Sequence, residues 1–201
     1  MAYEIQPYEK RGDGEVNATG TTQIVAEQSK AFRNVAVGAT IKIDTTEYTV
    51  VTKVDEETVN VNTAVTCSNK KWKYKNPNLT LSGIYYVKHN KSDKPTLSPI
   101  AINDANKAYA STGQGVVRDI TLSGFIQSTT MANIYKYATI LESLADGTQC
   151  RQGTCVYTED VPPRSSYVWI TSLNWQFSRD KPKWLDVMIN MVECKNRGSL
   201  N

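Results

Sequence analysis

Apolar and polar residues alternate along much of this chain, most clearly close to its C-terminal end. In the run 184–194 the apolar positions are Leu185, Val187, Ile189 and Met191, and mixed or polar residues lie between them. Successive side chains of a strand point to opposite faces, so this period of two predicts a strand with one buried face. The run 167–177 precedes it across a polar, proline-containing segment, and the two are predicted to form a long antiparallel hairpin.

Further short runs rich in β-branched residues predict a chain dominated by strands. They cover 21–25, 40–43, 47–51, 58–62, 79–87, 116–126 and 155–157. Within 116–126, the face that carries Ile120 and Leu122 is expected to be buried. The four runs between 21 and 62 are separated by short polar or glycine-containing segments, which predicts local hairpins in a small barrel or sandwich.

One segment has helical periodicity instead. Its apolar positions are Ile134, Tyr137, Ala138, Leu141, Leu144 and Ala145. Thr129-Thr130-Met131 is suited to open the helix, and Gly147 is placed where a helix commonly ends. The pattern predicts one principal amphipathic helix over about 130–146.

Together these elements predict a mainly β fold of the α+β kind. We expect an antiparallel β-sandwich or barrel core with one principal helix, built from residues 1–14 and 70–201. A small β-module, 15–69, is expected to be inserted into this core, because the character of the sequence changes at both of its ends. A chain of 201 residues is long enough for this arrangement.

The charge balance weighs against a nucleic-acid partner. The chain has 23 basic and 20 acidic residues, which give a formal charge of +3. This excess is too small and too dispersed for the positive field that phosphate binding uses. No apolar run is long enough for a membrane span, and the start of the sequence lacks a basic end followed by an apolar stretch. We therefore expect synthesis in a cytoplasm and no membrane partner.

The segment 70–77 alternates lysine with aromatic residues and allows two interpretations. The alternation of cations with Trp72 and Tyr74 can indicate a stacking platform for single-stranded nucleic acid. Simple alternation also predicts an exposed strand whose aromatic residues share one face and whose lysines face water. The second interpretation is favoured.

Residues suited to catalysis are few, and the sequence predicts no enzyme. The one histidine, His89, is expected in a polar loop, and no G-x-S-x-G motif is present. A hydrolase or a peptidoglycan-cleaving enzyme would need paired carboxylates in a cleft. The two acidic clusters, 55–57 and 159–160, lie in turn-like polar stretches where solvated carboxylates are expected. No nucleotide-binding glycine loop or cofactor motif is present.

Four cysteines do not make a disulfide framework or a metal site. Cys67 and Cys194 are expected to be half-buried strand residues. Cys150 and Cys155 are interpreted first as free thiols beside a hairpin, second as a disulfide formed after release from the cell, and last as metal ligands. No metal or cofactor is expected.

Two parts of the sequence resemble bacteriophage tail proteins. The first carries Val37-Gly38-Ala39-Thr40-Ile41-Lys42-Ile43 and Tyr48-Thr49-Val50-Val51-Thr52-Lys53-Val54, and is similar to a small β-module of tail and appendage proteins. That module's G-T-x-F step and V-G-D-x-I turn correspond here to Lys30-Ala31-Phe32 and Val37-Gly38-Ala39. The second, about 116–194, has the order strand, helix and closing hairpin, and resembles the fold shared by tail-tube, tube-initiator and distal tail proteins.

The resemblance implies a structural role in a virion tail. Such a domain joins copies of itself into a ring, usually sixfold, at the tube end or in the baseplate, after assembly in the host cytoplasm, and binds other tail or baseplate proteins. The candidate interface residues are Trp72, Tyr74, Tyr85, Tyr86, Trp175 and Trp184. Burial in a monomer core would account equally well for the aromatic content. The alternative function is a carbohydrate- or receptor-binding module, in which Trp72, Tyr74, Tyr85 and Tyr86 stack on sugar rings.

Overall fold

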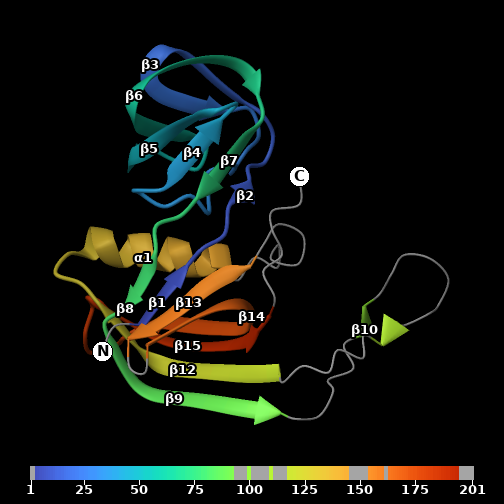
Figure 1. The fold of residues 1–201 in the computed structure, drawn as a ribbon. Helices are drawn as coiled ribbons and strands as arrows, with labels where there is room; N and C mark the ends of the chain where they lie inside the picture. The colour runs from blue at the N-terminus through green and yellow to red at the C-terminus, as the bar shows by residue number, and fades with distance from the viewer. Residues whose placement is uncertain are drawn as a thin grey trace.

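The computed structural model describes residues 3–92, 99–100, 109–110, 117–144, 154–160 and 163–194. In these ranges the chain forms two large antiparallel sheets, one α-helix and a short pair of strands, β10 (Pro99–Ile100) and β11 (Tyr109–Ala110) (Figure 1). The predicted fold class, mainly β with one helix, is confirmed. The helix lies between the two sheets (Figure 1).

The larger sheet has seven strands whose order in space mixes the two ends of the chain. They are β8 (Leu79–Leu81), β1 (Tyr3–Gln6), β13 (Cys155–Asp160), β14 (Pro163–Phe177), β15 (Trp184–Glu193), β12 (Val117–Gln127) and β9 (Gly83–Ser92). The predicted hairpin of 167–177 with 184–194 is the pairing of β14 with β15.

The two edge strands of this sheet, β8 and β9, follow one another in the chain with only Ser82 between them. The Ser82 hydroxyl accepts a hydrogen bond from the Gln127 amide at 3.0 Å and donates one to the Gln127 carbonyl at 3.3 Å. Ser82 therefore ties this corner to the end of β12. A chain can pass directly from one edge to the other only if the sheet curls, so the seven strands form a barrel-like surface with a concave inner face.

The inner face carries the core that the alternation predicted. Ile120 and Leu122 are buried, and so are all four predicted apolar positions of β15. The helix α1 (Met131–Leu144) covers part of this face and buries Ile134, Ala138 and Leu141, as its periodicity predicted. At its start, the Asn133 amide donates to the Thr130 hydroxyl at 3.3 Å, which makes Thr130 the N-cap. Ala145 and Gly147 lie outside the described residues.

The smaller sheet has six strands and its own core. Their order is β2 (Lys10–Arg11), β7 (Trp72–Lys75), β4 (Thr40–Ile43), β5 (Thr46–Lys53), β6 (Thr58–Lys70) and β3 (Val16–Ala26). The sheet includes β2 and β7, so it extends beyond both ends of the 15–69 range expected for the inserted module. Its core is built around Phe32, whose ring centroid lies 4.8 Å from that of Trp72.

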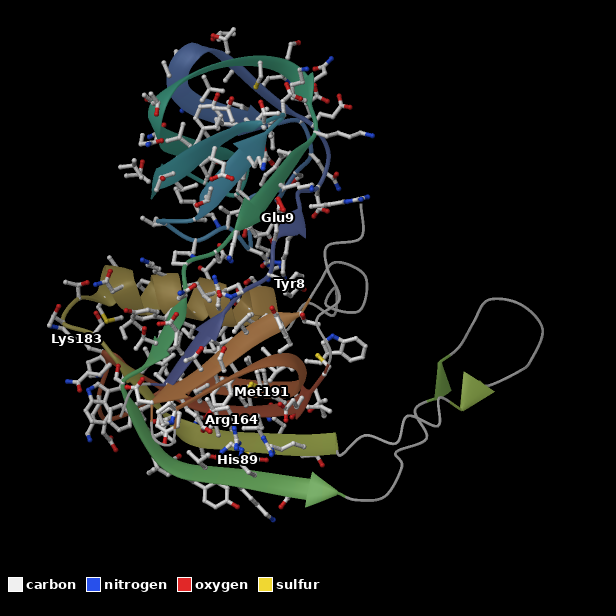
Figure 2. The ribbon with its side chains drawn as sticks, in the orientation of Figure 1. Tyr8, Glu9, His89, Arg164, Lys183 and Met191 are labelled. Carbon is white, nitrogen blue, oxygen red and sulfur yellow. The ribbon has the colours of Figure 1, made fainter. Side chains whose placement is uncertain are left out.

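The two sheets meet at a buried polar contact beside α1. The Asn76 amide group donates to Ser143 Oγ and to the Asn34 carbonyl, both at 2.9 Å, and its Oδ1 accepts from the Ala36 amide at 3.0 Å. Lys10 Nζ donates to the Ser143 carbonyl. The chain itself also passes between the two sheets, from β1 to β2, at two residues labelled in Figure 2. Tyr8 packs in the core of the larger sheet, and Glu9 forms an ion pair with Lys73 of the smaller sheet.

Candidate functional site

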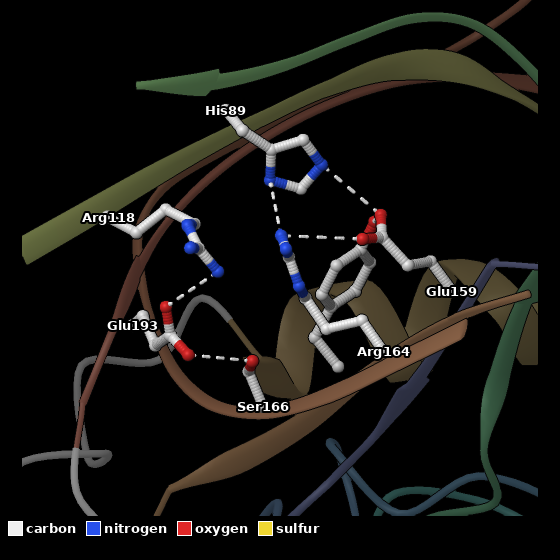
Figure 3. A network of polar contacts seen from close by, with 7 residues as sticks. His89, Arg118, Glu159, Arg164, Ser166 and Glu193 are labelled. Carbon is white, nitrogen blue, oxygen red and sulfur yellow. Dashed lines mark hydrogen bonds and ion pairs between the residues drawn. The ribbon is translucent and has the colours of Figure 1, made fainter. Parts of the chain in front are cut away.

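A cluster of charged and polar side chains lies on the inner face of the larger sheet, at one end of the strands. Its members come from β9, β12, β13, β14 and β15, and are His89, Arg118, Glu159, Arg164, Ser166 and Glu193 (Figure 3). On β12 the inner positions run from Arg118 to the apolar Ile120, and on antiparallel β15 they run from apolar Met191 to Glu193. The apolar core therefore changes to polar contacts along the same strands.

Glu159 is the centre of the cluster. Its side chain is only 2% exposed, and the carboxylate contacts His89 Nε2 at 3.2 Å and Arg164 at 3.6 Å. The Tyr157 hydroxyl donates to the same carboxylate at 2.9 Å. Burial, together with this hydrogen bond, raises the pKa of Tyr157 above its usual value of 10.0. Tyr157 therefore remains a hydrogen-bond donor at neutral pH.

Both ring nitrogens of His89 have partners. Nδ1 lies 3.5 Å from the Arg164 guanidinium, and Nε2 faces Glu159. Arginine can only donate, so Nδ1 must accept, while the hydrogen on Nε2 is directed at the carboxylate. Of the two neutral tautomers, these contacts fit the one that carries its hydrogen on Nε2.

A second pair completes the cluster. Arg118 lies 3.4 Å from Glu193, whose carboxylate also accepts a hydrogen bond from the Ser166 hydroxyl at 2.8 Å. The described contacts of His89 are those with Glu159 and Arg164. The cluster joins strands through ion pairs and hydrogen bonds, and Glu159 Oε1, 3.6 Å from Arg164, accepts no hydrogen bond among the described residues.

The contact between His89 and Glu159 spans the concave face. β9 and β13 are not neighbours, because β14, β15 and β12 lie between them in the sheet. A 3.2 Å contact between their side chains is possible only because the sheet is strongly curled. The cluster therefore holds the edge strand β9 in place over the inner face.

Two predictions about these residues are wrong. His89 was expected in a loop but lies in β9, and the 159–160 pair was expected to be a solvated turn but Glu159 is a buried strand residue. A signal for Glu159 was present, because Cys155, Tyr157 and Glu159 keep the period of two and all three are buried. By contrast, the acidic cluster 55–57 is exposed, as predicted.

The candidate interface aromatics divide into buried and accessible residues. Trp72 and Tyr74 are 3% and 6% exposed, so the prediction of an accessible aromatic surface is wrong for these two, which pack in the core of the smaller sheet. Their burial also removes the stacking platform for single-stranded nucleic acid. Tyr85 and Tyr86 are 73% and 47% exposed on the edge strand β9.

The other two candidates, Trp175 and Trp184, are half-buried. Trp175 packs against the larger core and lines a shallow hollow with Tyr85. Trp184 stacks on Phe125 with ring centroids 4.2 Å apart, and Lys181 Nζ lies 3.8 Å from its ring centroid. Tyr85 and Trp175 therefore line the same hollow, whereas Trp184 makes local contacts with Phe125 and Lys181.

Of the cysteines, Cys67 and Cys194 are half-buried, as predicted, and Cys155 is buried. Burial raises the pKa of the Cys67 thiol. Cys150 lies outside the described residues. Among the residues that the structure describes, no three His, Cys, Asp or Glu side chains gather as metal ligands, and α1 is not long and apolar enough to cross a membrane.

No protein-family model matches this chain, and no curated protein matches it in sequence.

Proposed function

We propose that this protein is a structural subunit of a bacteriophage-type tail, whose copies join into a ring at the end of the tail tube or in the baseplate. The proposal rests on the sequence resemblance and on one structural observation, the ten-residue edge strand β9. In the described part of the chain β9 pairs only with β12. Its outer edge therefore offers backbone donors and acceptors to a strand of a second copy.

The side chains of β9 suit such a contact. In the pairing with β12, Tyr86 lies opposite Ser123 and Ile84 lies opposite Gly124, so Tyr85 is the extra residue of a β-bulge. The bulge interrupts the alternation and leaves both tyrosines accessible. Tyrosine combines a large apolar ring with a polar end, which is why it is enriched at protein interfaces.

The sheet also holds β9 firmly. Gly124 allows the close approach, because a Cβ there would lie 2.2 Å from the Gly83 carbonyl oxygen. At the other end, His89 is held by Glu159 and Arg164. An edge fixed before association loses little conformational entropy when it pairs, which favours the ordered, repeated contacts of a ring.

Light scattering on the purified protein tests the proposal, at low and high concentration and after co-expression with neighbouring tail proteins. We expect discrete trimers, hexamers or larger rings. Tyr85→Asp combined with Tyr86→Asp should shift the population towards monomer, since it places two charges at the edge. Tyr135→Asp is the matched control, because Tyr135 is 58% exposed on α1. A strict monomer under all conditions, or equal effects of both changes, would contradict the proposal.

A carbohydrate- or receptor-binding role is the second candidate, and the hollow beside β9 favours it. Tyr85 lines this hollow together with the polar side chains of Asn174, Gln176 and Asp186. An exposed ring beside amide and carboxylate groups suits a sugar. Asn174→Ala separates the two candidates, because it removes an amide from the hollow but leaves the edge of β9 intact. Loss of sugar binding with unchanged oligomers would support the second role.

A further inference from the structure

The turn that joins β14 to β15 carries a group of cations. This segment, residues 178–183, is called the basic hairpin here and contains Arg179, Lys181 and Lys183 but only one acid, Asp180. All four charged residues are exposed. None of them forms an ion pair with another residue that the structure describes. The basic hairpin is therefore a positive surface that the described chain does not neutralise.

Hydrogen bonds hold the basic hairpin in one shape. The Ser178 amide donates to the Trp184 carbonyl at 3.1 Å, and the Trp184 amide donates to the Lys181 carbonyl at 2.9 Å. The Ser128 amide, shortly before α1, donates to the carbonyl of Lys183 at 3.1 Å, which ties the hairpin to the start of the helix (Figure 2). Like charges fixed close together repel each other, so an oppositely charged partner would stabilise this arrangement.

The basic hairpin is continuous with the edge of β9. Phe125 joins the two, because its ring stacks on Trp184, the first residue of β15. The same ring lies against Gly83, the first residue of β9, where an added Cβ would be 2.3 Å from it. Phe177, the last residue of β14, is 44% exposed and adds an apolar area beside the cations. A neighbour that pairs with β9 is therefore placed to meet the basic hairpin as well.

The smaller sheet carries a turn of the opposite charge. This segment between β5 and β6, residues 54–57, is called the acidic turn here and consists of Val54 followed by three acids, all exposed. None of its carboxylates forms an ion pair with a residue in the described ranges. The cation beside it, Lys53, donates to the Arg33 carbonyl at 2.8 Å. The acidic turn thus matches the basic hairpin in kind, with an apolar residue beside three charges, and has the opposite sign.

The acidic turn is also fixed before any association. Its Glu57 amide donates to Asp55 Oδ1 at 2.7 Å, and the Phe32 amide donates to the Glu56 carbonyl at 2.9 Å, which anchors the turn to the core of the smaller sheet. Two surfaces that are ordered in the free protein lose little conformational entropy when they bind each other. The two turns are therefore suited to a specific contact between copies.

We propose that the basic hairpin of one copy binds the acidic turn of the next copy. This inference rests on the proposed function, because it names two surfaces of the contact that builds the ring. A head-to-tail ring uses two different surfaces of each subunit, whereas one self-complementary surface closes a dimer. Each copy has one basic hairpin and one acidic turn, so each can bind two neighbours. Opposite charges across the contact also disfavour the wrong pairings, hairpin with hairpin and turn with turn.

Charge reversal on each surface, followed by mixing, tests this contact by light scattering. The hairpin variant is Arg179→Glu combined with Lys183→Glu, and the turn variant is Glu56→Lys combined with Glu57→Lys. We expect each variant alone to need at least about tenfold more protein than the wild type for assembly, since like charges then face each other. An equal mixture of the two should assemble again, into rings with an even number of subunits, because every contact in it joins opposite charges.

Lys30→Glu combined with Lys71→Glu is the matched control, because it changes the net charge as much as the hairpin variant does, at two exposed lysines outside both surfaces. The control should assemble within about twofold of the wild-type concentration. If either charge-reversed variant assembles as the wild type does, or if mixing brings no recovery, the inference is overturned and the proposed function still stands. A wild-type protein that stays monomeric under all conditions contradicts the proposed function, and this inference with it.

Discussion

The two sheets of this protein bury different kinds of side chain. The smaller sheet closes over a core of apolar residues that centres on Phe32 and Trp72. The charged Lys10 of this sheet is buried where it donates to the Ser143 carbonyl of α1. The larger sheet has an apolar core under α1, but the same strands continue into a buried charge cluster around Glu159. The smaller sheet therefore relies mainly on apolar packing, and the larger sheet adds ion pairs inside its concave face.

The strand order explains the difference. In the smaller sheet, β4, β5 and β6 are neighbours both in the chain and in space. In the larger sheet, β9 must be held over β13, which lies about 70 residues further along the chain in sequence. Apolar contacts are not directional, whereas paired charges have one favourable geometry. We infer that the cluster fixes a curvature that apolar packing alone would specify less sharply.

The largest expected effect comes from breaking the apolar core. Phe32→Ala should lower the free energy of unfolding by about 4 kcal/mol, as large-to-small changes at fully buried aromatic sites do. If the sheets are distinct in their packing, the loss of hydrogen-exchange protection should concentrate in β3 to β7. Val51→Ala is the control, because Val51 is 52% exposed on the same sheet.

An equal loss of protection in both sheets after Phe32→Ala would contradict this division. It would mean that the two cores unfold as one unit, although they bury different kinds of side chain. Denaturant unfolding followed by hydrogen exchange with mass spectrometry distinguishes the two outcomes.

The sequence predicted most of the strands because they carry local signals. The alternation in 116–126 and 184–194 gave the buried positions of β12 and β15, and helical spacing gave α1. The short strand β1 was missed, since Tyr3–Gln6 has too few residues for a period to show. The alternation in 70–77 predicts a strand, but it does not show that the face with Trp72 and Tyr74 is buried, because that depends on the residues that pack over this face.

The charge cluster could not be predicted because its members are distant in the sequence. His89 and Glu159 meet only after five strands have been placed in a curled sheet. The bulge at Tyr85 likewise depends on the pairing of β9 with β12. Sequence patterns report which side of a strand is apolar, but not which partners lie across a concave face.

The second largest effect should come from the cluster itself. Arg164→Met keeps most of the apolar stem but removes the guanidinium, which leaves the buried Glu159 with His89 and Tyr157 as partners. We expect a loss of about 3 kcal/mol, as found when one partner of a buried ion pair is removed. Arg179→Met, at an exposed position between β14 and β15, is the control and should cost little.

A double variant tests whether the loss comes from the unpaired charge. Adding Glu159→Gln to Arg164→Met removes the buried carboxylate, so the double variant should be less destabilised than the sum of the two single changes. Strict additivity would show that Arg164 and Glu159 contribute independently, and the ion-pair explanation of the larger sheet would fail.

The smallest of the three effects concerns the contact that joins the two regions. Asn76 is buried where the chain passes from β7 to β8, and its side chain bonds to the Ala36 amide, the Asn34 carbonyl and Ser143 of α1. Asn76→Ala should cost about 2 kcal/mol, because it leaves a buried amide without its acceptor. Asn62→Ala is the control: it removes a similar hydrogen bond to the Thr49 amide at an exposed site and should cost less than about 1 kcal/mol.

Asn76→Ala should also change the cooperativity of unfolding, so that the two sheets unfold in distinct steps. A single, equally cooperative transition in this variant would show that apolar contacts beside α1 already couple the two regions without Asn76.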